Sequence, residues 1–589
     1  MPAHAQNIYS FGRFELDIHD RSLRREGALV GLTGKAFDVL ALLVRNRGRI
    51  VSKQEFMESV WQGAFVEEAT LTQNIFTLRK VLGDEHGRRG IILTVPGHGY
   101  RFIAEVTELS SADEVRLETE RRSSASKSNR GVAAQSLLVL PFINECADPT
   151  SEYLSDGITE SVINSLASLQ HLRIIARSTA FRYKGTILSH QQVGKELGVR
   201  TVLGGRVQHI ADQLVIKTEL TDVENGWQLW GGHFNRSFSD TYEVQEEIAQ
   251  MISEKLNLHL KAQERNRLTK RYTENLEAYL LYLKGRYYWN KYTAPEMQQG
   301  MEFFRQAIDL DPTYALAYAG LADCYYRLSN LSLPPREAMP KARAAAVKAL
   351  EIDETLAEGH ASLGLVKLYY DWNFAEAGTA FARAIDLKPG SALAHQRYGL
   401  YFSNMGQFEE AKREFGLALE LDPLSPQITT SLGSGYYFGR EYERAIVEGK
   451  KALTLDPKLF PANLLLGMSY EQLGQLPEAI AEFERVRTLT NTRLALGYLG
   501  HAYAQAGQVE AARKILQELE GAKENGYLSS FLPALIRIEL GETDLVFELL
   551  EKAFEERNEW LSWLKTDPRL DRLRPDPRFQ SLLTRVGYR

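Results

Sequence analysis

The sequence predicts a multidomain chain with a small α+β domain first, a small α/β sheet domain second and an all-α repeat solenoid last. Its 589 residues exceed what one hydrophobic core usually holds, since domains typically run to about 100–200 residues. The residue pattern changes after the first hundred residues, and a short phrase recurs at nearly constant spacing after residue 276. The expected divisions are 1–104, 105–135, 136–261, 262–520 and 521–589.

Composition places the chain among ordinary folded proteins. Apolar residues make up 44% and charged residues 25%, which excludes collagen-like and wholly disordered classes. The two cysteines, Cys146 and Cys324, are too few for a disulfide framework or a four-thiolate zinc site, so we expect a reducing compartment. No leader-like segment and no 18-residue apolar stretch occurs, so we expect a cytoplasmic protein without a membrane anchor.

The net charge is −6, but residues 1–104 carry 14 Lys and Arg against 11 Asp and Glu. The first domain is therefore slightly basic within an acidic chain. This difference permits nucleic-acid binding without arguing for it.

The first domain alternates short strand patterns with helical ones. A small antiparallel sheet is expected from three apolar-alternating stretches, at Ile8–Phe11, Phe14–Ile18 and Ala28–Leu32. Thr33 then caps a helix that ends near Gly48, where glycine suits a left-handed terminus. Ser52 caps a second helix through Trp61, and Glu55 completes a capping box.

A third helix is predicted from Glu68 to Leu82. Its buried face is formed by residues at i, i+4, i+7 and i+11, namely Leu71, Ile75, Leu78 and Leu82. The opposite face carries no acidic residue and consists of Thr72, Gln73, Asn74, Phe76, Thr77, Arg79 and Lys80. Amides, a hydroxyl, an aromatic edge and basic groups suit contact with base edges and phosphates in a DNA major groove.

A hairpin follows, in which Ile91–Val95 and Tyr100–Ile103 flank a tight turn at Pro96–Gly99. The sheet, three helices and hairpin wing together resemble the OmpR/PhoB-type winged helix-turn-helix effector domain over residues 8–104. The segments that carry the resemblance are Leu32–Leu40, Gly48–Ser52, Leu78–Gly83 and Thr94–Phe102.

The resemblance implies a site on double-stranded promoter DNA. The third helix then enters the major groove, with Gln73, Asn74, Phe76, Thr77 and Arg79 at contact positions and Lys80 beside them. Thr94 matches a phosphate contact of the wing. The loop between helices two and three matches the segment that meets RNA polymerase, namely Gln62, Gly63, Ala64, Phe65, Val66 and Glu67.

Two residues depart from that family. Pro96 stands where members often have an arginine for the minor groove, and His98 or Arg101 then takes its place. Phe76 and Thr77 stand where basic residues are common, so phosphate attraction is expected to be weaker and the DNA sequence different.

Residues 105–135 are predicted to be a flexible tether, because they hold few large apolar residues. The domain after them is expected to contain a strand at Leu137–Leu140, a hairpin over Arg200–Asp222, a strand at Trp227–Phe234, and helices at Ile158–Leu169 and Val244–Leu260. It resembles the TolB-N-like domain of CadC-like regulators and some cyclase-linked chains, through Leu140–Phe142, Tyr153–Gly157, Phe181–Gly185 and Glu196–Val199. Arg177, Arg182 and Lys184 form either an anion site or a solvated basic rim.

The repeated phrase predicts tetratricopeptide repeats. It occurs at Ala307–Pro312, Ala349–Glu354, Ala384–Pro389, Ala418–Pro423 and Ala452–Pro457. Successive copies lie 42, 35, 34 and 34 residues apart, and 34 residues is the period of that helix–turn–helix repeat. An insertion near Ser329–Pro335 accounts for the longer first interval. Such repeats build a superhelix whose concave face binds a protein or peptide partner.

No phosphate-binding loop, zinc-spaced His/Glu pair or nucleophile elbow appears, so we predict no catalytic residues, metal or cofactor. The predicted function is that of a bacterial DNA-binding transcription regulator with phosphorelay-like signal transduction. We find no receiver domain ahead of the winged helix, so phosphorylation of an aspartate is not the expected input. Its repeats sense a cytoplasmic partner or mediate self-association, and we expect a homodimer on repeated half-sites. The alternatives are a repeat scaffold in which the winged helix makes protein contacts, and a cyclase-associated subunit.

Overall fold

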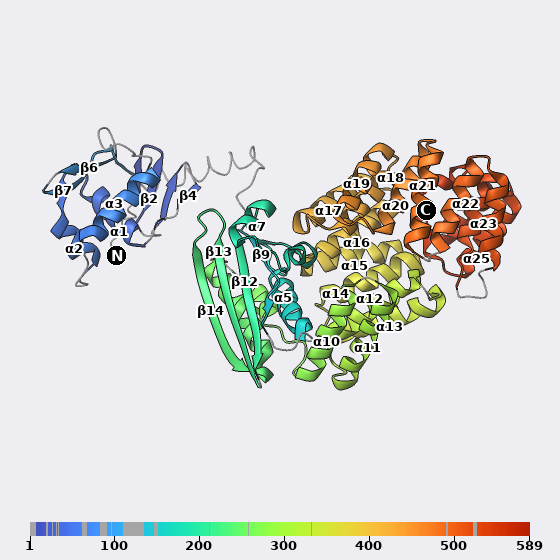
Figure 1. The fold of residues 1–589 in the computed structure, drawn as a ribbon, viewed down its shortest axis with the longest axis horizontal. Helices are drawn as coiled ribbons and strands as arrows, with labels where there is room; N and C mark the ends of the chain where they lie inside the picture. Colours follow the sequence, from blue (N-terminus) through green and yellow to red (C-terminus); the bar gives the residue numbers. More distant parts are fainter. Residues whose placement is uncertain are drawn as a thin grey trace. The chain divides into compact units, whose positions relative to one another are not determined.

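The computed structural model describes residues 8–18, 22–25, 28–30, 32, 34–61, 68–82, 91–95, 97–109, 135–145, 151–210, 212–256, 258, 260–291, 293–331, 333–490, 493–521 and 527–588. The chain divides into two compact units, Met1–Val132 and Ala133–Arg589 (Figure 1). Each unit buries hydrophobic clusters of its own. The multidomain organisation of α+β, α/β and all-α parts is confirmed.

The first unit opens with a five-stranded antiparallel sheet in the order β4-β3-β2-β1-β8. Its strands are β1 (Ile8–Phe11), β2 (Phe14–Asp17), β3 (Ser22–Arg25), β4 (Ala28–Val30) and β8 (Thr107–Leu109). The sequence pattern does not predict β3, because Leu23 is the one apolar residue of that strand. The domain boundary at 104 was also too early: Thr107–Leu109, assigned to the tether, pair with β1 and satisfy backbone groups on its edge.

Three helices and a second sheet complete this unit. They are α1 (Gly34–Arg45), α2 (Lys53–Trp61), α3 (Glu68–Leu82), β5 (Ile50–Ser52), β6 (Ile92–Val95) and β7 (Gly99–Phe102), with strand order β5-β7-β6. Leu40, Val44, Phe56, Leu78 and Phe102 are fully or almost fully buried between them. The predicted cap at Thr33 lies outside the described residues.

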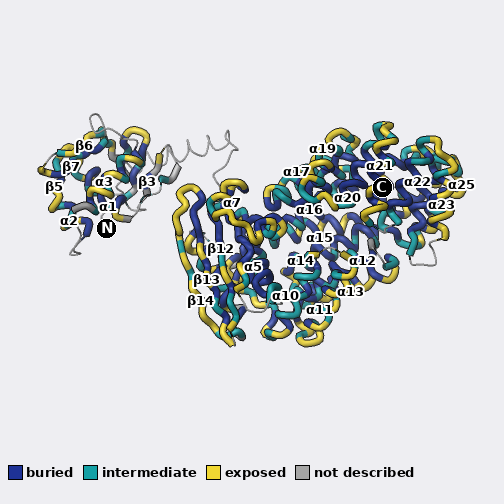
Figure 2. Tube along the Cα trace, in the orientation of Figure 1, coloured by how far each residue is buried: buried dark blue, intermediate teal, exposed yellow. Residues whose placement is uncertain are grey.

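The second unit begins with a mixed sheet in the order β11-β9-β12-β13-β14, with β10 beside β12. The strands are β9 (Gln135–Val139), β10 (Ile143–Asn144), β11 (Leu172–Ile174), β12 (Thr201–Ile210), β13 (Gln213–Asp222) and β14 (Gln228–Ser237). β9 runs parallel to both of its neighbours, and β12 to β14 form an antiparallel meander. The predicted hairpin and flanking strands are confirmed. β14 is the largely exposed edge strand (Figure 2).

Helix α5 packs against both the sheet and the first repeat helix. The helices around the sheet are α5 (Glu152–Leu166), α6 (Arg177–Ala180), η2 (Phe181–Tyr183), α7 (His190–Leu197), η3 (Phe238–Asp240), α8 (Thr241–Lys255) and α9 (Ala262–Leu268). α5 packs on β9, α8 and α10 and is buried along most of its length (Figure 1). It begins six residues before the predicted start, because the polar residues at its beginning are buried too and break the apolar pattern.

The rest of the chain is a run of helix pairs. Its helices are α10 (Leu276–Trp289), α11 (Ala294–Leu310), α12 (Ala315–Leu331), α13 (Pro335–Ile352), α14 (Ala357–Val366), η4 (Lys367–Asp371), α15 (Phe374–Leu387), α16 (Ala392–Met405), α17 (Phe408–Leu421), α18 (Pro426–Phe438), α19 (Tyr442–Leu455), α20 (Phe460–Gln472), α21 (Leu476–Leu489), α22 (Arg493–Gln505), α23 (Val509–Gly521), α24 (Phe531–Glu539), α25 (Thr543–Glu555), η6 (Glu559–Trp563), η7 (Pro568–Leu573) and α26 (Pro577–Val586). In several pairs a glycine meets a large residue: a Cβ on Gly399 would lie 2.6 Å from the ring of Phe415.

The first helix of each pair lines the inner face of this superhelix. First helices of neighbouring pairs, such as α16, α18 and α20, pack against each other, whereas their second helices are spread further apart. A stack of helix pairs whose helices pack more closely on one side curves toward that side. The concave face of the predicted solenoid is therefore formed by α12, α14, α16, α18, α20 and α22.

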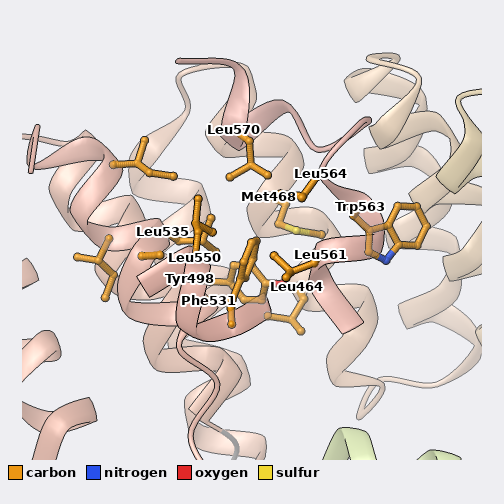
Figure 3. Close-up of a cluster of buried hydrophobic side chains, with 14 of the residues drawn as sticks. Leu464, Met468, Tyr498, Phe531, Leu535, Leu550, Leu561, Trp563, Leu564 and Leu570 are labelled. Carbon is orange, nitrogen blue, oxygen red and sulfur yellow. The ribbon is translucent and has the colours of Figure 1, made fainter. Parts of the chain in front are cut away.

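Much of that concave face is covered by the chain's own C-terminal segment, residues 558–588. Trp563 stacks on Phe438 of α18 with ring centroids 4.1 Å apart, and Tyr588 stacks on Phe374 at 4.5 Å. Buried leucines of η6 and η7, including Leu561 and Leu570, join Leu464 and Met468 of α20 in one cluster (Figure 3). The segment that we predicted as a terminal cap thus also fills the groove.

The sheet domain and the repeats form one compact body rather than two separate ones. Tyr279 and Leu283 of α10 belong to the core of the sheet domain. The side chains of Ser178 and Thr179 donate hydrogen bonds to Asp422 at the end of α17. The guanidinium of Arg182 donates to the carbonyl of Leu455 at 2.9 Å. The residues around Arg177 and Arg182 therefore lie at the contact between the sheet domain and the repeats. They do not form a solvated rim, and they do not form an anion site of the sheet domain alone.

Candidate nucleic-acid interface

Helix α3 is held to the first unit by a buried apolar stripe. Leu71, Ile75, Leu78 and Leu82 are each at most 5% exposed. This confirms the predicted buried face, and the opposite side of the helix therefore faces away from the core. On that side Thr72, Gln73, Phe76 and Lys80 are exposed, and Phe76 presents 63% of its surface.

Two polar residues of this face are bound back to their own helix. The Asn74 amide nitrogen donates to the carbonyl of Thr70 at 2.7 Å, and the Thr77 hydroxyl donates to the carbonyl of Gln73 at 2.9 Å. Each still has an acceptor oxygen to offer. These bonds fix the side-chain directions, so the acceptor groups of Asn74 and Thr77 are held in place before any ligand arrives.

Arg79 joins α3 to the wing. Its Nη2 donates to the carbonyl of Ile92 at 2.9 Å and to the hydroxyl of Thr94 at 2.7 Å. Both acceptors lie on β6, so one guanidinium fixes the helix against the hairpin. The family resemblance implies separate DNA contacts for Arg79 and Thr94. Their contact with each other joins residues 15 positions apart and leaves no local pattern in the sequence.

The hairpin turn between β6 and β7 depends on glycine. Gly97 has φ +75° and Gly99 has φ +144°, both in the region that L-residues avoid. A Cβ on Gly99 would also lie 2.0 Å from the carbonyl oxygen of Val51 on β5. The close approach holds the wing against β5 and leaves His98 exposed at the tip. Pro96 lies outside the described residues.

Arg101 points from the middle strand β7 and is partly exposed. It lies opposite Ile50 of β5 and Leu93 of β6, and its Nε is buried with no hydrogen-bond partner in the described part of the chain. The structure therefore gives His98 and Arg101 different positions on the wing, with His98 at the turn and Arg101 within the sheet.

The start of α2 is fixed by the predicted capping box. The backbone N–H of Glu55 donates to the Ser52 hydroxyl at 3.1 Å, and the backbone N–H of Ser52 donates to the Glu55 carboxylate at 2.8 Å. Arg49 adds an ion pair to Glu55 at 2.8 Å. The hydrogen bond from the Ser52 backbone, followed by the bond from Arg49, lowers the pKa of Glu55 to about 2.

The predicted polymerase loop, Gln62–Glu67, lies outside the described residues. Of the helix before it, Trp61 is buried, and the Lys35 ammonium donates to the carbonyl of Val60 at 2.6 Å. This contact ties α2 to the start of α1. Lys35 belongs to Leu32–Leu40, one of the segments that carry the family resemblance. In the structure its side chain joins α1 to α2.

A protein family described as "Transcriptional regulatory protein, C terminal" matches residues 27–102. The first unit is an OmpR/PhoB-type effector domain. The match spans all three helices and the wing, from shortly before β4 to the end of β7. The tetratricopeptide repeat family matches residues 392–423 and 464–527, which correspond to α16–α17 and to the region from α20 to α23.

Several similar proteins come from bacteria. The chain is 32% identical over 237 residues to "Putative adenylate cyclase 3" of Rhizobium meliloti, and the match covers 40% of each protein. It is 25% identical over 409 residues to "Transcriptional regulator HilA" of Salmonella typhi, covering 68% of each. The solved "DNA binding domain of E. coli CadC" is 26% identical, with 18% of this chain and 99% of that one covered at a TM-score of 0.17.

The OmpR/PhoB-type domain is thus joined to tetratricopeptide repeats in one chain. The chain spans less than half the length of the relative whose name contains adenylate cyclase. The activity in that name therefore describes the relative and not this chain. No helix among the described residues is long and apolar enough to span a membrane.

Proposed function

We propose that this protein is a sequence-specific DNA-binding transcriptional regulator that acts by binding rather than catalysis. The observation that carries the proposal is the outer face of α3, which is free of acidic residues, fixed against the wing by Arg79, and turned away from the core. A helix with these groups matches a major groove in shape and charge. Because its ligand is chromosomal, the protein works in the cytoplasm.

Each predicted residue has a role in this proposal. Gln73 and Asn74 offer amides to base edges, and the Phe76 ring offers apolar contact to a thymine methyl group. Thr77 offers its hydroxyl to a base. Lys80 and the tip residue His98 approach phosphates, and Arg101 approaches the backbone beside the wing. Arg79 and Thr94 position the helix against the wing in addition to their phosphate contacts.

The finer parts of the proposal concern partners. Residues 62–67 contact RNA polymerase, as the resemblance implies. A single winged helix buries limited area, so the protein binds repeated half-sites as a dimer. The second unit carries the signal, through a cytoplasmic partner or through self-association.

The competing function is that of a repeat scaffold whose winged helix contacts protein. The exposed ring of Phe76 favours it, because a large apolar side chain on a surface also suits a protein interface. The two functions differ in what Phe76 recognises: a thymine methyl in the first, and a protein surface in the second.

Selection of bound duplexes from a random-sequence library by the full chain tests the proposal. We expect an enriched motif, and Phe76→Ala should relax the preference for one T·A pair while leaving the other positions unchanged. Lys341→Ala, on the exposed surface of α13, is the matched control and should leave the motif intact. Absence of any enriched motif would favour the scaffold.

A further inference from the structure

The sheet of the second unit ends in a long strand that is paired on one side only. β14 (Gln228–Ser237) pairs with β13 and is the last strand in the order of the sheet (Figure 1). No strand among the described residues pairs with its other side. At ten residues β14 is about twice as long as an average strand. An edge of this length offers its backbone groups to another chain.

The features that usually protect a sheet edge are few on β14. Proteins guard such edges with lysine, proline, inward-pointing charges or bulges. β14 contains no lysine, proline or acidic residue, and its one arginine, Arg236, pairs with Glu247 of α8 at 3.1 Å. The bulge in its register lies at the start of the strand, next to Trp230. Residues 230–237 therefore form a regular edge.

The backbone groups of β14 alternate in direction. The Phe238 N–H donates to the carbonyl of Asp212 at 2.8 Å, which continues the antiparallel register of β13 and β14 as a hydrogen-bonded pair. Such pairs recur at every second residue, so residues 230, 232, 234 and 236 direct their N–H and C=O groups toward β13. The intervening residues direct theirs to the open side, namely Gly231, His233 and Asn235. The Arg236 guanidinium reaches the outward carbonyl of Asn235 at 3.2 Å, and that oxygen keeps a second lone pair.

The side chains of β14 alternate as well. Trp230 and Phe234 lie on the face that packs toward the core, with ring centroids 6.2 Å apart. Gly232 lies between them, and a Cβ there would come within 2.6 Å of the Trp230 ring and 2.7 Å of the Phe234 ring. The middle of this face therefore presents bare backbone between two rings. On the other face His233 and Asn235 are exposed.

We infer that a second copy of this chain pairs with β14, edge to edge and antiparallel, about a two-fold axis at His233. Hydrogen-bonded pairs across the open edge join outward-directed residues, and a two-fold axis makes the two contacts identical. With the axis at His233, residues 230–236 of one copy pair with residues 230–236 of the other. His233 then faces His233 of the second copy, and Gly231 faces Asn235.

The inner face of β14 is complementary to itself in this register. Phe234 of each copy lies opposite Gly232 of the other, so a ring covers the bare backbone. Arg236 lies opposite Trp230, which favours a cation–π contact. An axis at Gly232 would instead place that glycine against itself, and an axis at Phe234 would place it against Arg236. The register at His233 is thus the one in which each inner residue has a partner of suitable size.

This pairing joins two sheets into one and gives the outward backbone groups of both edges a partner. It also supplies a contact for the dimer that the proposed function places on repeated half-sites. Its role on DNA rests on that proposed function, whereas the association of two copies is measured without DNA.

Sedimentation velocity of the full chain over a range of concentrations tests the inference, and we expect a concentration-dependent dimer. His233→Lys and His233→Glu keep the backbone N–H but place like charges opposite each other at the axis. Each should therefore raise the dimer Kd about threefold or more. An equimolar mixture of the two variants should restore association, because opposite charges then face each other. His233→Gln is the matched control, adds no charge and should dimerise as the wild type does. The side chain at this position is exposed, so these changes leave the core intact.

Three results would overturn the inference. A chain that stays monomeric up to about 100 μM would leave the edge to a different partner. A dimer that both charged variants leave unchanged would place the interface elsewhere. A mixture that associates no better than either variant alone would show that His233 does not face its own copy. A chain that dimerises as expected but binds no duplex DNA would overturn the proposed function instead, and the interface would stand.

Discussion

Glu55 shows how one side chain fixes the entry to the helix-turn-helix. It accepts from the Ser52 backbone and from Arg49, and these two bonds stabilise its charged form. Its folded-state pKa is therefore below its unfolded value. A carboxylate with a depressed pKa contributes stability above the unfolded pKa, and this contribution is lost as the pH falls through the folded one.

Glu55→Gln should remove this pH dependence. The amide still accepts the hydrogen bond from Ser52 but does not titrate. The wild-type free energy of unfolding of the first unit should fall between pH 4.5 and about 2 more steeply than that of the variant. Urea unfolding at a series of pH values measures it. Parallel curves for the two proteins would show that the Glu55 charge has no role in stability.

The neighbouring residues Arg79 and Lys80 separate positioning from phosphate contact. Arg79 donates two hydrogen bonds to β6, whereas Lys80 is exposed on the outer face of α3. Arg79→Ala should lower the free energy of unfolding by roughly 1–3 kcal/mol, the cost of losing charged hydrogen bonds. Lys80→Ala should leave stability unchanged and reduce the slope of log Kd for DNA against log salt by about 1. Denaturant unfolding and salt titration measure the two effects. Equal stability of the two variants would remove the positioning role of Arg79.

The wing depends on a glycine that touches another strand. Gly99→Ala meets both a positive φ and the carbonyl of Val51 at 2.0 Å, so it should destabilise the first unit by about 3 kcal/mol or more. Gly97→Ala is the matched control, because its φ is +75° but no atom lies within 4 Å of the added Cβ. That variant should cost about 1–2 kcal/mol. Thermal unfolding compares them, and a larger loss at Gly97 would contradict the packing argument.

The C-terminal segment is the element that joins distant repeats. Trp563 packs on Phe438 and contributes to the largest core cluster. Trp563→Ala should lower the free energy of unfolding of the second unit by about 3–5 kcal/mol, as large buried-to-small changes do. Trp227→Ala, where the side chain is 61% exposed, should cost less than about 0.5 kcal/mol. Urea unfolding measures both. Similar small losses would show that residues 558–588 rest on the groove without supporting it.

These elements show what sequence periodicity predicts and what it misses. The stripe on α3, the capping box at Ser52 and the hairpin of β12 and β13 depend on residues close in sequence, and all were predicted. The edge strand β8 was missed, because pairing with β1 across about a hundred residues leaves no local pattern. The same holds for the Arg79–Thr94 contact and for the packing of Trp563 into the groove. The 34-residue period predicts a concave face but contains no information on what covers it.

In the whole molecule, the first unit presents the outer face of α3 and the wing, whereas the second unit covers much of its concave face with its own residues 558–588. A protein partner on the covered part of that face would have to displace a segment in which Leu561, Leu564 and Leu570 are fully buried.

We propose that the outer face of α3 binds the phosphate backbone and bases of duplex DNA. Fluorescence anisotropy of the full chain on a labelled promoter duplex, measured over a range of salt concentrations, tests this binding. We expect the affinity to fall linearly on a log–log plot with a slope set by several phosphate contacts, and Lys80→Ala to make the slope shallower. Binding that does not respond to salt, or no binding at low salt, would show that this face of α3 does not contact DNA phosphates.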